Sequence, residues 1–270
     1  MSRPMSRPMN RKPWLRGGGT ALGTAAGLWA ANALPAITSA GSLRAALVPT
    51  TTGIGRPGGV AFTFDDGPDP ASTPRFLDLL SAHGVRATFF LLGFMIRRAP
   101  GLAAEIAAAG HDIGVHGDLH RNLLFRDPLS TTADITAARD LIAETTGSLP
   151  RWYRPPYGIL TTSAVLAATG LGMRPVLWSC WGRDWTVRAT PESVRRTVRR
   201  RLADGSTVLL HDADCTSAPQ SWRATLGALP ALLDDCREHG WQPVTLSRHL
   251  TPARPAVTER AGRGRPAVGL

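Results

Sequence analysis

The sequence contains few cysteines, and their spacing excludes one class of site. Three occur among 270 residues, at Cys180, Cys215 and Cys236. No two have the short separation of a cysteine metal cluster, and any single disulfide would leave one thiol over. If an oxidising compartment joins two of them, we expect Cys180 to pair with Cys215, because both follow predicted strand ends on the same side of the fold.

Acidic residues are scarcer than basic ones, 20 against 31, which gives a net charge of +11. The excess lies in the tails: residues 1–16 carry +5, residues 248–270 carry +4, and the body between them carries only +2. One basic cluster occurs in the body, with five arginines between residues 195 and 201. We expect it to form the solvated face of a helix; a polyanion site is the alternative. Because the sequence also lacks a nucleic-acid-binding motif, no nucleic-acid partner is predicted.

Charged residues are absent between residues 17 and 43. This stretch follows a basic start, and the small residues before Gly41 resemble a cleavage site. We predict that residues 1–43 form a signal peptide or membrane anchor, so that the protein is secreted or membrane-anchored on the extracytoplasmic side. A disordered cytoplasmic tail is the alternative. Residues 251–270, rich in Pro, Arg and Gly, are predicted to form a disordered basic tail.

Long-period repeats are also absent, and the body alternates short apolar runs with amphipathic stretches. This alternation is typical of strands followed by helices in a parallel α/β sheet. We predict one domain with strands at residues 59–64, 86–92, 112–116, 151–154, 174–178, 206–211 and 241–245. The helices between them are expected to end near Gly84, Gly110 and Gly147.

Reactive side chains follow the predicted strands at their carboxyl ends. In a parallel barrel these ends form one rim, so residues far apart in the sequence can converge there. The residues concerned are Asp65 and Asp66, His116 and His120, Arg154 and Tyr157, Asp184 and Trp185, and His211.

The chemistry of this set favours a hydrolytic metal site. His116 and His120 are four residues apart, a spacing that can present both imidazoles to one metal ion. An aspartate from the first strand would complete a His, His, Asp set with room for water, and its neighbour could then act as general base. The simpler interpretations are that the histidines are surface residues and that the "DDGP" run at 65–68 is a turn before a helix.

Five short motifs resemble those of one known family. They are "TFDDGP" (63–68), "HGDLH" (116–120), "RPPY" (154–157), "RDW" (183–185) and "LLH" (209–211). In this order they resemble the polysaccharide deacetylase family, the NodB-homology domain of carbohydrate esterase family 4, over residues 58–250. The resemblance implies a distorted (β/α)7 barrel with a single catalytic domain, and metal-dependent removal of acetyl groups from N-acetylated sugars.

The resemblance also implies a role for each matching residue. Asp66, His116 and His120 would hold Zn²⁺ or another divalent ion such as Co²⁺. Asp65 would take a proton from the metal-bound water that attacks the acetyl group, and His211 would protonate the leaving amine. Two residues would support the acid and the base: Asp184 would keep His211 protonated, and Arg154 would orient Asp65. The backbone N–H of Tyr157 would stabilise the oxyanion. Trp185 and Leu209 would enclose the acetyl group.

Two positions depart from the family pattern. Gly117 stands where the family usually has Ser or Thr, and Trp181 stands where the fourth motif usually begins with Asp. The first change removes a hydroxyl from the histidine loop, and the second alters how the charge of Arg154 is balanced. Among the other residues, we expect Trp181 and Trp222 to be sugar platforms at the rim, Trp152, Trp178 and Trp241 to be core residues, and His83 and His111 to cap helices.

We therefore predict a metal-dependent deacetylase that acts on N-acetylated oligo- or polysaccharides of the cell envelope. The enzymatic alternatives are an O-acetyl esterase and a lipid-linked amino-sugar deformylase, the second favoured if the N-terminal segment stays in the membrane. The alternative of another class is an inactive carbohydrate-binding barrel. Binding alone would not require Asp65 and His211, which argues against that alternative.

Overall fold

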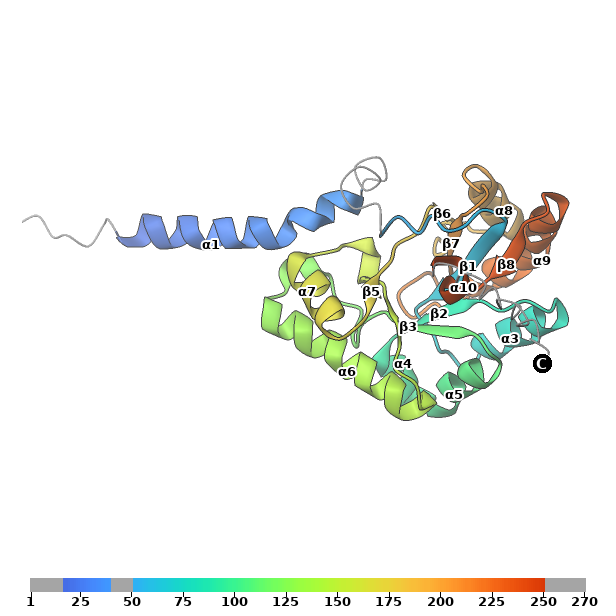
Figure 1. The fold of residues 1–270 in the computed structure, drawn as a ribbon, viewed down its shortest axis with the longest axis horizontal. Helices are drawn as coiled ribbons and strands as arrows, with labels where there is room; N and C mark the ends of the chain where they lie inside the picture. Colours follow the sequence, from blue (N-terminus) through green and yellow to red (C-terminus); the bar gives the residue numbers. More distant parts are fainter. Residues whose placement is uncertain (1–16, 40–50, 251–270) are drawn as a thin grey trace, which may run out of the picture.

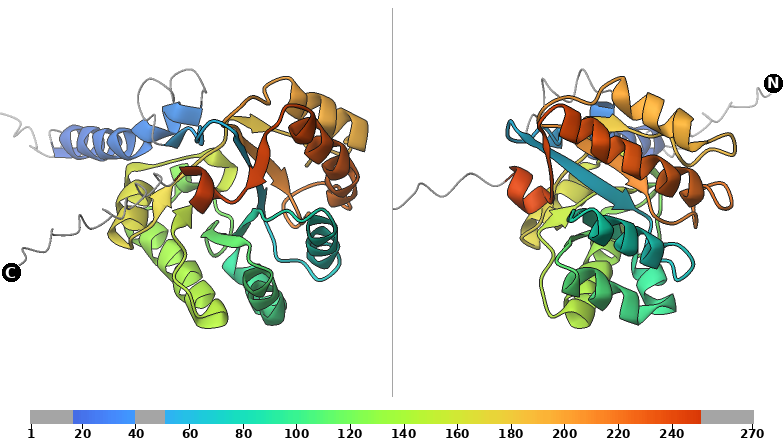
Figure 2. Two further views of the ribbon diagram at one scale, coloured as in Figure 1. Left: turned by 45° about the vertical axis from the view of Figure 1, so that its right-hand side comes forward. Right: turned by 90° about the vertical axis from the view of Figure 1, so that its right-hand side faces the viewer.

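The computed structural model describes residues 17–39 and 51–250. Within these residues, eight short parallel strands form one curled sheet with helices around it (Figures 1 and 2). The distorted barrel expected from the sequence is confirmed. Its strands are β1 (Gly59–Asp65), β2 (Thr88–Leu91), β3 (Asp112–Val115), β4 (Trp152–Tyr153), β5 (Arg174–Pro175), β6 (Cys180–Trp181), β7 (Thr207–His211) and β8 (Gln242–Val244).

Strand β1 lies at the centre of the sheet. It pairs with β7 along one edge and, along the other, with β8 near its start and with β2 near its end. Every residue of β1 is buried, as expected for a parallel strand that is covered on both faces. Its last residue, Asp65, is in register with Phe90 of β2 and with His211 of β7. The pairing therefore brings the ends of β1 and β7 together.

The barrel has a gap between β5 and β6, which are the two ends of the strand order β5-β4-β3-β2-β1-β7-β6. The sequence predicts one strand at 174–178, whereas the structure has β5 at Arg174–Pro175, which pairs with β4, and an additional strand, β6, at Cys180–Trp181, which pairs with β7. Between them, the N–H of Leu177 donates to the carbonyl of Thr51, and the N–H of Ser179 donates to that of Thr207. One apolar run thus crosses from one edge of the sheet to the other.

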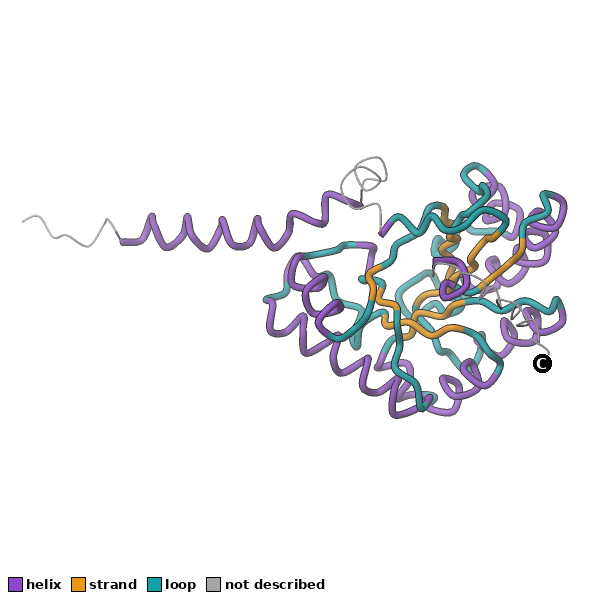
Figure 3. Tube along the Cα trace, in the orientation of Figure 1, coloured by secondary structure: helices purple, strands orange, loops and turns teal. Residues whose placement is uncertain are grey.

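Helices cover the outside of the curled sheet, and the strands lie between them in Figure 3. Apolar residues from both layers form the main core. The longer helices are α3 (Thr73–Ala82), α5 (Pro100–Ala108), α6 (Pro128–Thr146), α7 (Thr162–Gly170), α8 (Pro191–Arg199) and α9 (Trp222–Glu238), and the short ones are α4 (Gly93–Arg98), α10 (Leu246–Leu250) and the 3-10 turns η3 (Leu123–Phe125) and η4 (Pro156–Gly158).

Helix α10 lies at the amino ends of two strands. The N–H of Leu246 donates to the hydroxyl of Thr88, the first residue of β2, at 3.0 Å. The N–H of Ser247 donates to the carboxylate of Asp112, the first residue of β3, at 2.7 Å. The opposite, carboxyl ends of the strands carry the predicted reactive residues.

Helix α8 carries the internal basic cluster. Val194 and Val198 of this helix are buried, while its arginines are half-buried or exposed. Arg195 forms an ion pair with Asp235 of α9, with 2.6 Å between the nearest nitrogen and oxygen atoms. The cluster is a solvated helix face, as expected.

Helix α1 (Gly17–Ala33) extends away from the barrel in Figure 1, and the 3-10 turn η1 (Leu34–Ser39) follows it. The indole N–H of Trp29 donates to the carbonyl of Leu124 at 2.9 Å, which attaches the end of α1 to the turn η3. None of the helices in the described ranges is both long and apolar enough to span a membrane. The signal peptide or anchor at 1–43 stays a prediction, since residues 1–16 and 40–43 lie outside the described residues. The predicted basic tail at 251–270 also lies outside them.

The cysteines are all free thiols. The expected pairing of Cys180 with Cys215 is wrong, because Cys180 is the first residue of β6 and does not follow a strand end at the rim. It pairs in register with Val208, three residues before the end of β7, and is buried in the same core cluster as Cys236. Cys215 lies exposed on the loop after β7.

Candidate active site

The predicted metal ligands meet at the carboxyl ends of β1 and β3. Asp65 ends β1 and Asp66 follows it, while His116 directly follows β3. Nε2 of His116 and Nε2 of His120 each lie 3.4 Å from Oδ1 of Asp66. One ligand atom from each of these three residues lies within 4.8 Å of the others, and no second group of this kind occurs in the described part of the chain. The structure therefore brings together the three residues expected from the sequence.

These residues fit a divalent cation. Oδ1 of Asp66 is buried and has no hydrogen-bond partner among the described residues, a state that a bound cation would relieve. Burial lowers the pKa of both histidines, to about 3 for His116, so each imidazole is neutral and offers a lone pair at neutral pH. Nδ1 of His116 donates to the carbonyl oxygen of Arg154 at 2.8 Å, which leaves Nε2 as the ligand atom.

Three residues of the site have a left-handed backbone conformation. The φ angles are 77° for Asp66, 49° for His120 and 59° for Tyr157. Such conformations cost about 1–3 kcal/mol each outside glycine, and they persist where the surrounding structure imposes them. Their concentration here supports a functional site at the rim.

Asp65 and Arg154 form a buried ion pair beside the candidate metal ligands. Nη1 of Arg154 lies 2.7 Å from Oδ1 of Asp65, and both side chains are almost fully buried. Burial raises the pKa of Asp65, and the guanidinium of Arg154 opposes this rise. The other oxygen, Oδ2, lies 3.7 Å from Nε2 of His116. One oxygen of Asp65 is therefore held by Arg154 while the other faces the metal-ligand group.

Apart from the carboxylate of Asp65, the guanidinium of Arg154 contacts neutral groups. Its guanidinium donates to the hydroxyl of Thr63 at 2.8 Å and to the carbonyl oxygens of Val176 and Leu177 at 3.4 and 3.0 Å. It also lies 4.0 Å from the ring centroid of Phe90. Backbone carbonyls and an aromatic face thus stand in for the aspartate that the fourth motif lacks.

The half-buried His211 and the buried Asp184 form a second pair. Nδ1 of His211 lies 3.0 Å from Oδ1 of Asp184, whose Oδ2 accepts the N–H of His211 and the hydroxyl of Thr225. Burial opposes the charged form of His211, but the carboxylate of Asp184 outweighs it and raises the pKa of His211 to about 10. Burial likewise opposes ionisation of Asp184, but the imidazolium outweighs it and lowers that pKa. At neutral pH the pair is an imidazolium and a carboxylate.

A cavity of about 240 Å³ opens between these groups, and its apolar wall consists of Tyr157, Trp178, Trp181, Trp185 and Leu209. The ring of Trp181 lies 6.2 Å from that of Trp178 and 5.2 Å from that of Trp185, measured between centroids. Trp181 therefore lines the cavity as expected. The prediction of Trp178 as a core residue is wrong, because the chain crosses between β5 and β6 at this point and turns the indole toward the cavity.

Trp222 does not lie at the rim. It is the first residue of α9, is buried in the main core, and has the guanidinium of Arg223 4.8 Å from its ring centroid. Its prediction as a sugar platform is therefore wrong, because the residue belongs to the helix rather than to the preceding loop.

Two residues of the site were not predicted. Oδ2 of Asp134, on α6, accepts the N–H of Asp118 at 2.9 Å and would lie 2.8 Å from a Cβ atom built on Gly117. Asp134 thus steadies the histidine loop in place of the missing hydroxyl. Thr216 donates its hydroxyl proton to Oδ2 of Asp66 at 2.5 Å. No local sequence pattern predicts that either residue belongs to the site, because each is brought there from a distant segment by the packing of the fold.

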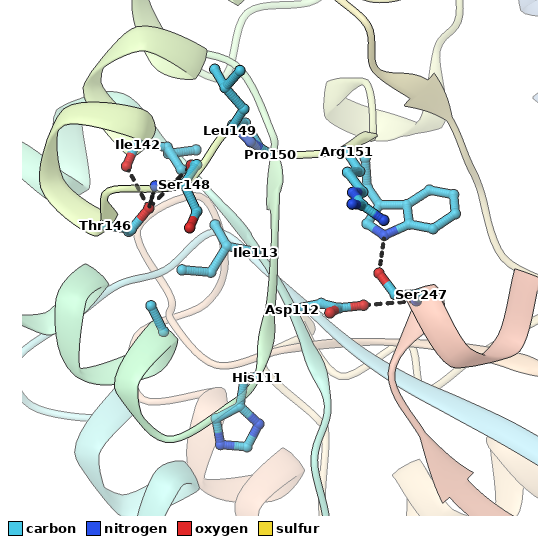
Figure 4. A pocket seen from close by; sticks show the side chains of 12 residues that line it. His111, Asp112, Ile113, Ile142, Thr146, Ser148, Leu149, Pro150, Arg151 and Ser247 are labelled. Carbon is cyan, nitrogen blue, oxygen red and sulfur yellow. Dashed lines mark hydrogen bonds between the residues drawn. The ribbon is translucent and has the colours of Figure 1, made fainter. Parts of the chain in front are cut away.

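A second cavity, of about 350 Å³, lies at the other end of the barrel, beside the amino end of β3 (Figure 4). The carboxylate of Asp112 in this cavity already accepts the N–H of Ser247. His111 also lines this cavity. Its ring accepts the N–H of Ala87 at 2.9 Å, so the prediction that His111 caps a helix is wrong. The same prediction for His83 is confirmed, because its ring contacts the carbonyl of Leu79 at the end of α3. Although larger, this cavity contains no metal-ligand group among the described residues.

Comparison with known proteins agrees with the geometry. A family model described as polysaccharide deacetylase matches residues 53–176. A chitooligosaccharide deacetylase from Bradyrhizobium sp. (strain ANU 289) is 35% identical over 184 residues, which cover 64% of this chain and 84% of that protein. A peptidoglycan-N-acetylglucosamine deacetylase from Bacillus cereus is 34% identical over 193 residues, which cover 71% and 87%. The chain belongs to the polysaccharide deacetylase family.

Solved structures of polysaccharide deacetylases share the fold. The crystal structure of a peptidoglycan N-acetylglucosamine deacetylase aligns with a TM-score of 0.69 and 30% identity, over 74% of this chain and 91% of that one. A CE4 family pseudoenzyme from Bacillus anthracis aligns with a TM-score of 0.65 and 25% identity, over 72% and 65%. Because the fold occurs with and without activity, the function of a given member depends on its site residues.

Proposed function

We propose that this protein is a metal-dependent hydrolase that removes acetyl groups from N-acetylated glucosamine units of a cell-envelope polysaccharide. The names of the peptidoglycan and chitooligosaccharide deacetylases among its relatives support this substrate class. The observation that carries the proposal is a candidate cation-binding group beside a buried carboxylate and a half-buried imidazolium, all lining one cavity.

The metal would be held by Asp66, His116 and His120, a donor set typical of Zn²⁺ and also suited to Co²⁺. When bound, such an ion polarises the acyl carbonyl and makes a coordinated water more acidic. Asp65 would accept the proton of the attacking water at Oδ2, the oxygen that Arg154 does not hold. The raised pKa of Asp65 makes it a stronger base than an exposed aspartate, and Arg154 favours its ionised form.

His211 would donate its proton to the departing nitrogen. An amine leaves poorly unless it is protonated, so an amide needs this acid more than an ester does. Asp184 keeps the imidazole charged, with its pKa raised to about 10. This protonation state favours N-deacetylation over hydrolysis of O-acetyl esters.

The remaining residues of the cavity would bind the substrate. The backbone N–H of Tyr157 would stabilise the developing oxyanion, a contribution of about 3–4 kcal/mol for one such donor. Trp185 and Leu209 would enclose the acetyl methyl group, and the rings of Trp178 and Trp181 would contact the sugar. A Cβ atom on residue 158 would lie 2.5 Å from the ring of Trp178, so glycine is needed next to Tyr157.

A carbohydrate-binding barrel without activity would need the aromatic wall only. Burying the Asp65 carboxylate and the His211 imidazolium opposes folding, and neither group is needed to stack against a sugar. Catalysis accounts for both groups.

We also propose that the protein acts on the extracytoplasmic side, secreted or anchored by residues 1–43. The relatives named for peptidoglycan support this location.

Product analysis tests the function. Purified protein would be incubated with peptidoglycan fragments, chitin oligomers, acetylated xylan and an N-formylated lipid-linked amino sugar, and released acetate and formate would be measured. We expect acetate from the first two substrates, loss of activity with a chelator, and recovery when Zn²⁺ or Co²⁺ is restored.

The matched variants are His116→Ala, which should lose both metal and turnover, and His83→Ala at the end of α3, which should keep both. Full activity in a metal-free preparation would refute the mechanism. Acetate from xylan alone, or formate as the main product, would instead refute the substrate class.

A further inference from the structure

The two carboxylate oxygens of Asp66 have different surroundings. Oδ1 lies 3.4 Å from Nε2 of both His116 and His120 and has no hydrogen-bond partner in the described part of the chain. Oδ2 accepts a hydrogen bond from the hydroxyl of Thr216 at 2.5 Å. One oxygen is thus left for a cation, and the other is already engaged.

Thr216 reaches Asp66 from a loop that is itself held in place. The loop, residues 212–221, follows β7, and Thr216 lies 150 positions after Asp66 in the sequence. The thiol of the neighbouring Cys215 donates to the backbone carbonyl of Asp66 at 3.4 Å. On the other side of Thr216, the N–H of Ala218 donates to the carbonyl of Trp185 at 3.0 Å. These contacts present the hydroxyl to the carboxylate in a fixed orientation.

We propose that Thr216 is a positioning residue that fixes Asp66 as a metal ligand through Oδ1 alone. A carboxylate without such a partner can rotate or bind an ion through both oxygens. The hydrogen bond at Oδ2 restricts the side chain before the ion arrives, so less conformational freedom is lost on binding. Hydrogen-bond partners of metal ligands typically change metal affinity or activity by about 10- to 100-fold when they are removed. This inference rests on the metal-dependent function proposed above.

The position of Thr216 makes the role testable. The residue is exposed at the mouth of the cavity, so replacing its hydroxyl by a methyl group removes the hydrogen bond and alters little of the core. Thr132, on the outer face of α6, is an exposed threonine whose hydroxyl donates to the carbonyl of Pro128 at 2.9 Å. It offers the same substitution at a residue that does not line the cavity.

The experiment measures Zn²⁺ affinity without substrate. Metal-free wild-type protein, Thr216→Val, Thr216→Ser and Thr132→Val would be titrated in competition with a chromophoric chelator, and circular dichroism would check that each variant is folded. We expect Thr216→Val to bind Zn²⁺ about 10- to 100-fold more weakly. Thr216→Ser, which restores the hydroxyl, and Thr132→Val should bind as the wild type does.

Equal affinity of Thr216→Val and wild type would overturn the proposal. Equal weakening of Thr216→Ser and Thr216→Val would also overturn it, because the hydroxyl would then not be the group that matters. If the wild type itself bound no Zn²⁺, the metal-dependent function would fail together with this inference. Wild-type binding that Thr216→Val leaves unchanged would refute the role of Thr216 alone.

Discussion

At the scale of single residues, Asp65 and Asp66 are adjacent in the chain yet have different partners. Consecutive residues of a regular strand point to opposite faces of the sheet. Here the strand ends at Asp65, and Asp66 has a φ of 77°, so both carboxylates reach the same cavity. Asp65 meets Arg154, and Asp66 meets the two histidines. The left-handed residue therefore allows a proposed base and a proposed ligand to be neighbours.

Exchange of each carboxylate for an amide separates the two roles. In Asp65→Asn we expect metal to stay bound while kcat falls by about 10²- to 10⁴-fold, the usual contribution of a general base. In Asp66→Asn we expect loss of the metal itself. Metal content by mass spectrometry and acetate release would be measured on the same samples. Metal loss in Asp65→Asn with retention in Asp66→Asn would reverse the assignment.

The His211–Asp184 pair predicts a change in the pH profile. The carboxylate of Asp184 raises the pKa of His211 to about 10, so the proposed acid loses its proton only in alkaline solution. Asp184→Asn removes that carboxylate, so the alkaline limb of the pH profile of kcat/KM should move toward lower pH. Because the ionisable groups of the site interact, each limb reports the titration of the coupled groups and not of one residue. Asp140→Asn, at an exposed position on α6, is the control. An unchanged alkaline limb in Asp184→Asn would remove His211 from the role of acid.

At the scale of elements, the loop after β3 depends on a residue from α6. Gly117 has a φ of 100°, and the carboxylate of Asp134 occupies the space that a side chain on residue 117 would take. That carboxylate is itself fixed by the N–H of Asp118. Gly117, which departs from the family pattern, therefore leaves the space that the carboxylate of Asp134 needs in order to hold the loop.

Restoring a side chain at residue 117 should destabilise the protein, although the family usually has one there. For Gly117→Ala we expect a loss of about 1–3 kcal/mol in the free energy of unfolding, because the left-handed backbone is strained and Asp134 must move. Urea denaturation of the metal-free protein would measure it. Gly170→Ala, in α7 with open space around it, should leave stability unchanged or raise it by up to about 1 kcal/mol. A Gly117→Ala variant as stable as Gly170→Ala would contradict the arrangement.

At the scale of the whole molecule, the site lies at the carboxyl ends of the strands, and the main core lies between the strands and the surrounding helices. Cys180 and Cys236 lie in the core formed by strands and helices, and Cys215 lies at the rim. Strand register, not distance along the chain, separates them. The thiols therefore report separately on the rim and on the core.

Alkylation should distinguish the three thiols. In the native protein we expect iodoacetamide to modify Cys215 alone, because this residue is exposed, and slowly, because partial desolvation of the thiol and nearby carboxylates raise its pKa. Cys180 and Cys236 should react only in urea concentrations that unfold the protein. Peptide mapping by mass spectrometry would locate the label. Modification of Cys236 in the native protein would show that α9 opens independently of the barrel.

Local sequence patterns were enough to predict the class of fold and most of the candidate site. Alternating apolar runs and capped helices predict a parallel barrel, and a parallel barrel gathers the carboxyl ends of its strands at one rim. An aspartate at the end of the first strand could therefore be grouped with His116 and His120 from the sequence, and the family resemblance selected Asp66. This worked because each residue sits at a fixed offset from a strand end, and strand ends are read from local hydrophobic periodicity.

Only the tertiary structure decided the contacts that depend on register and on chain crossings. Residues 174–181 cross from one edge of the sheet to the other, which turns Trp178 toward the cavity, and the register of β6 places Cys180 in the core. Thr216 and Asp134 reach the site from segments that carry no local mark of it. The periodicity of apolar side chains predicts which face of a helix or strand is buried. Which residues that face contacts depends on how elements that are distant in the sequence pack together.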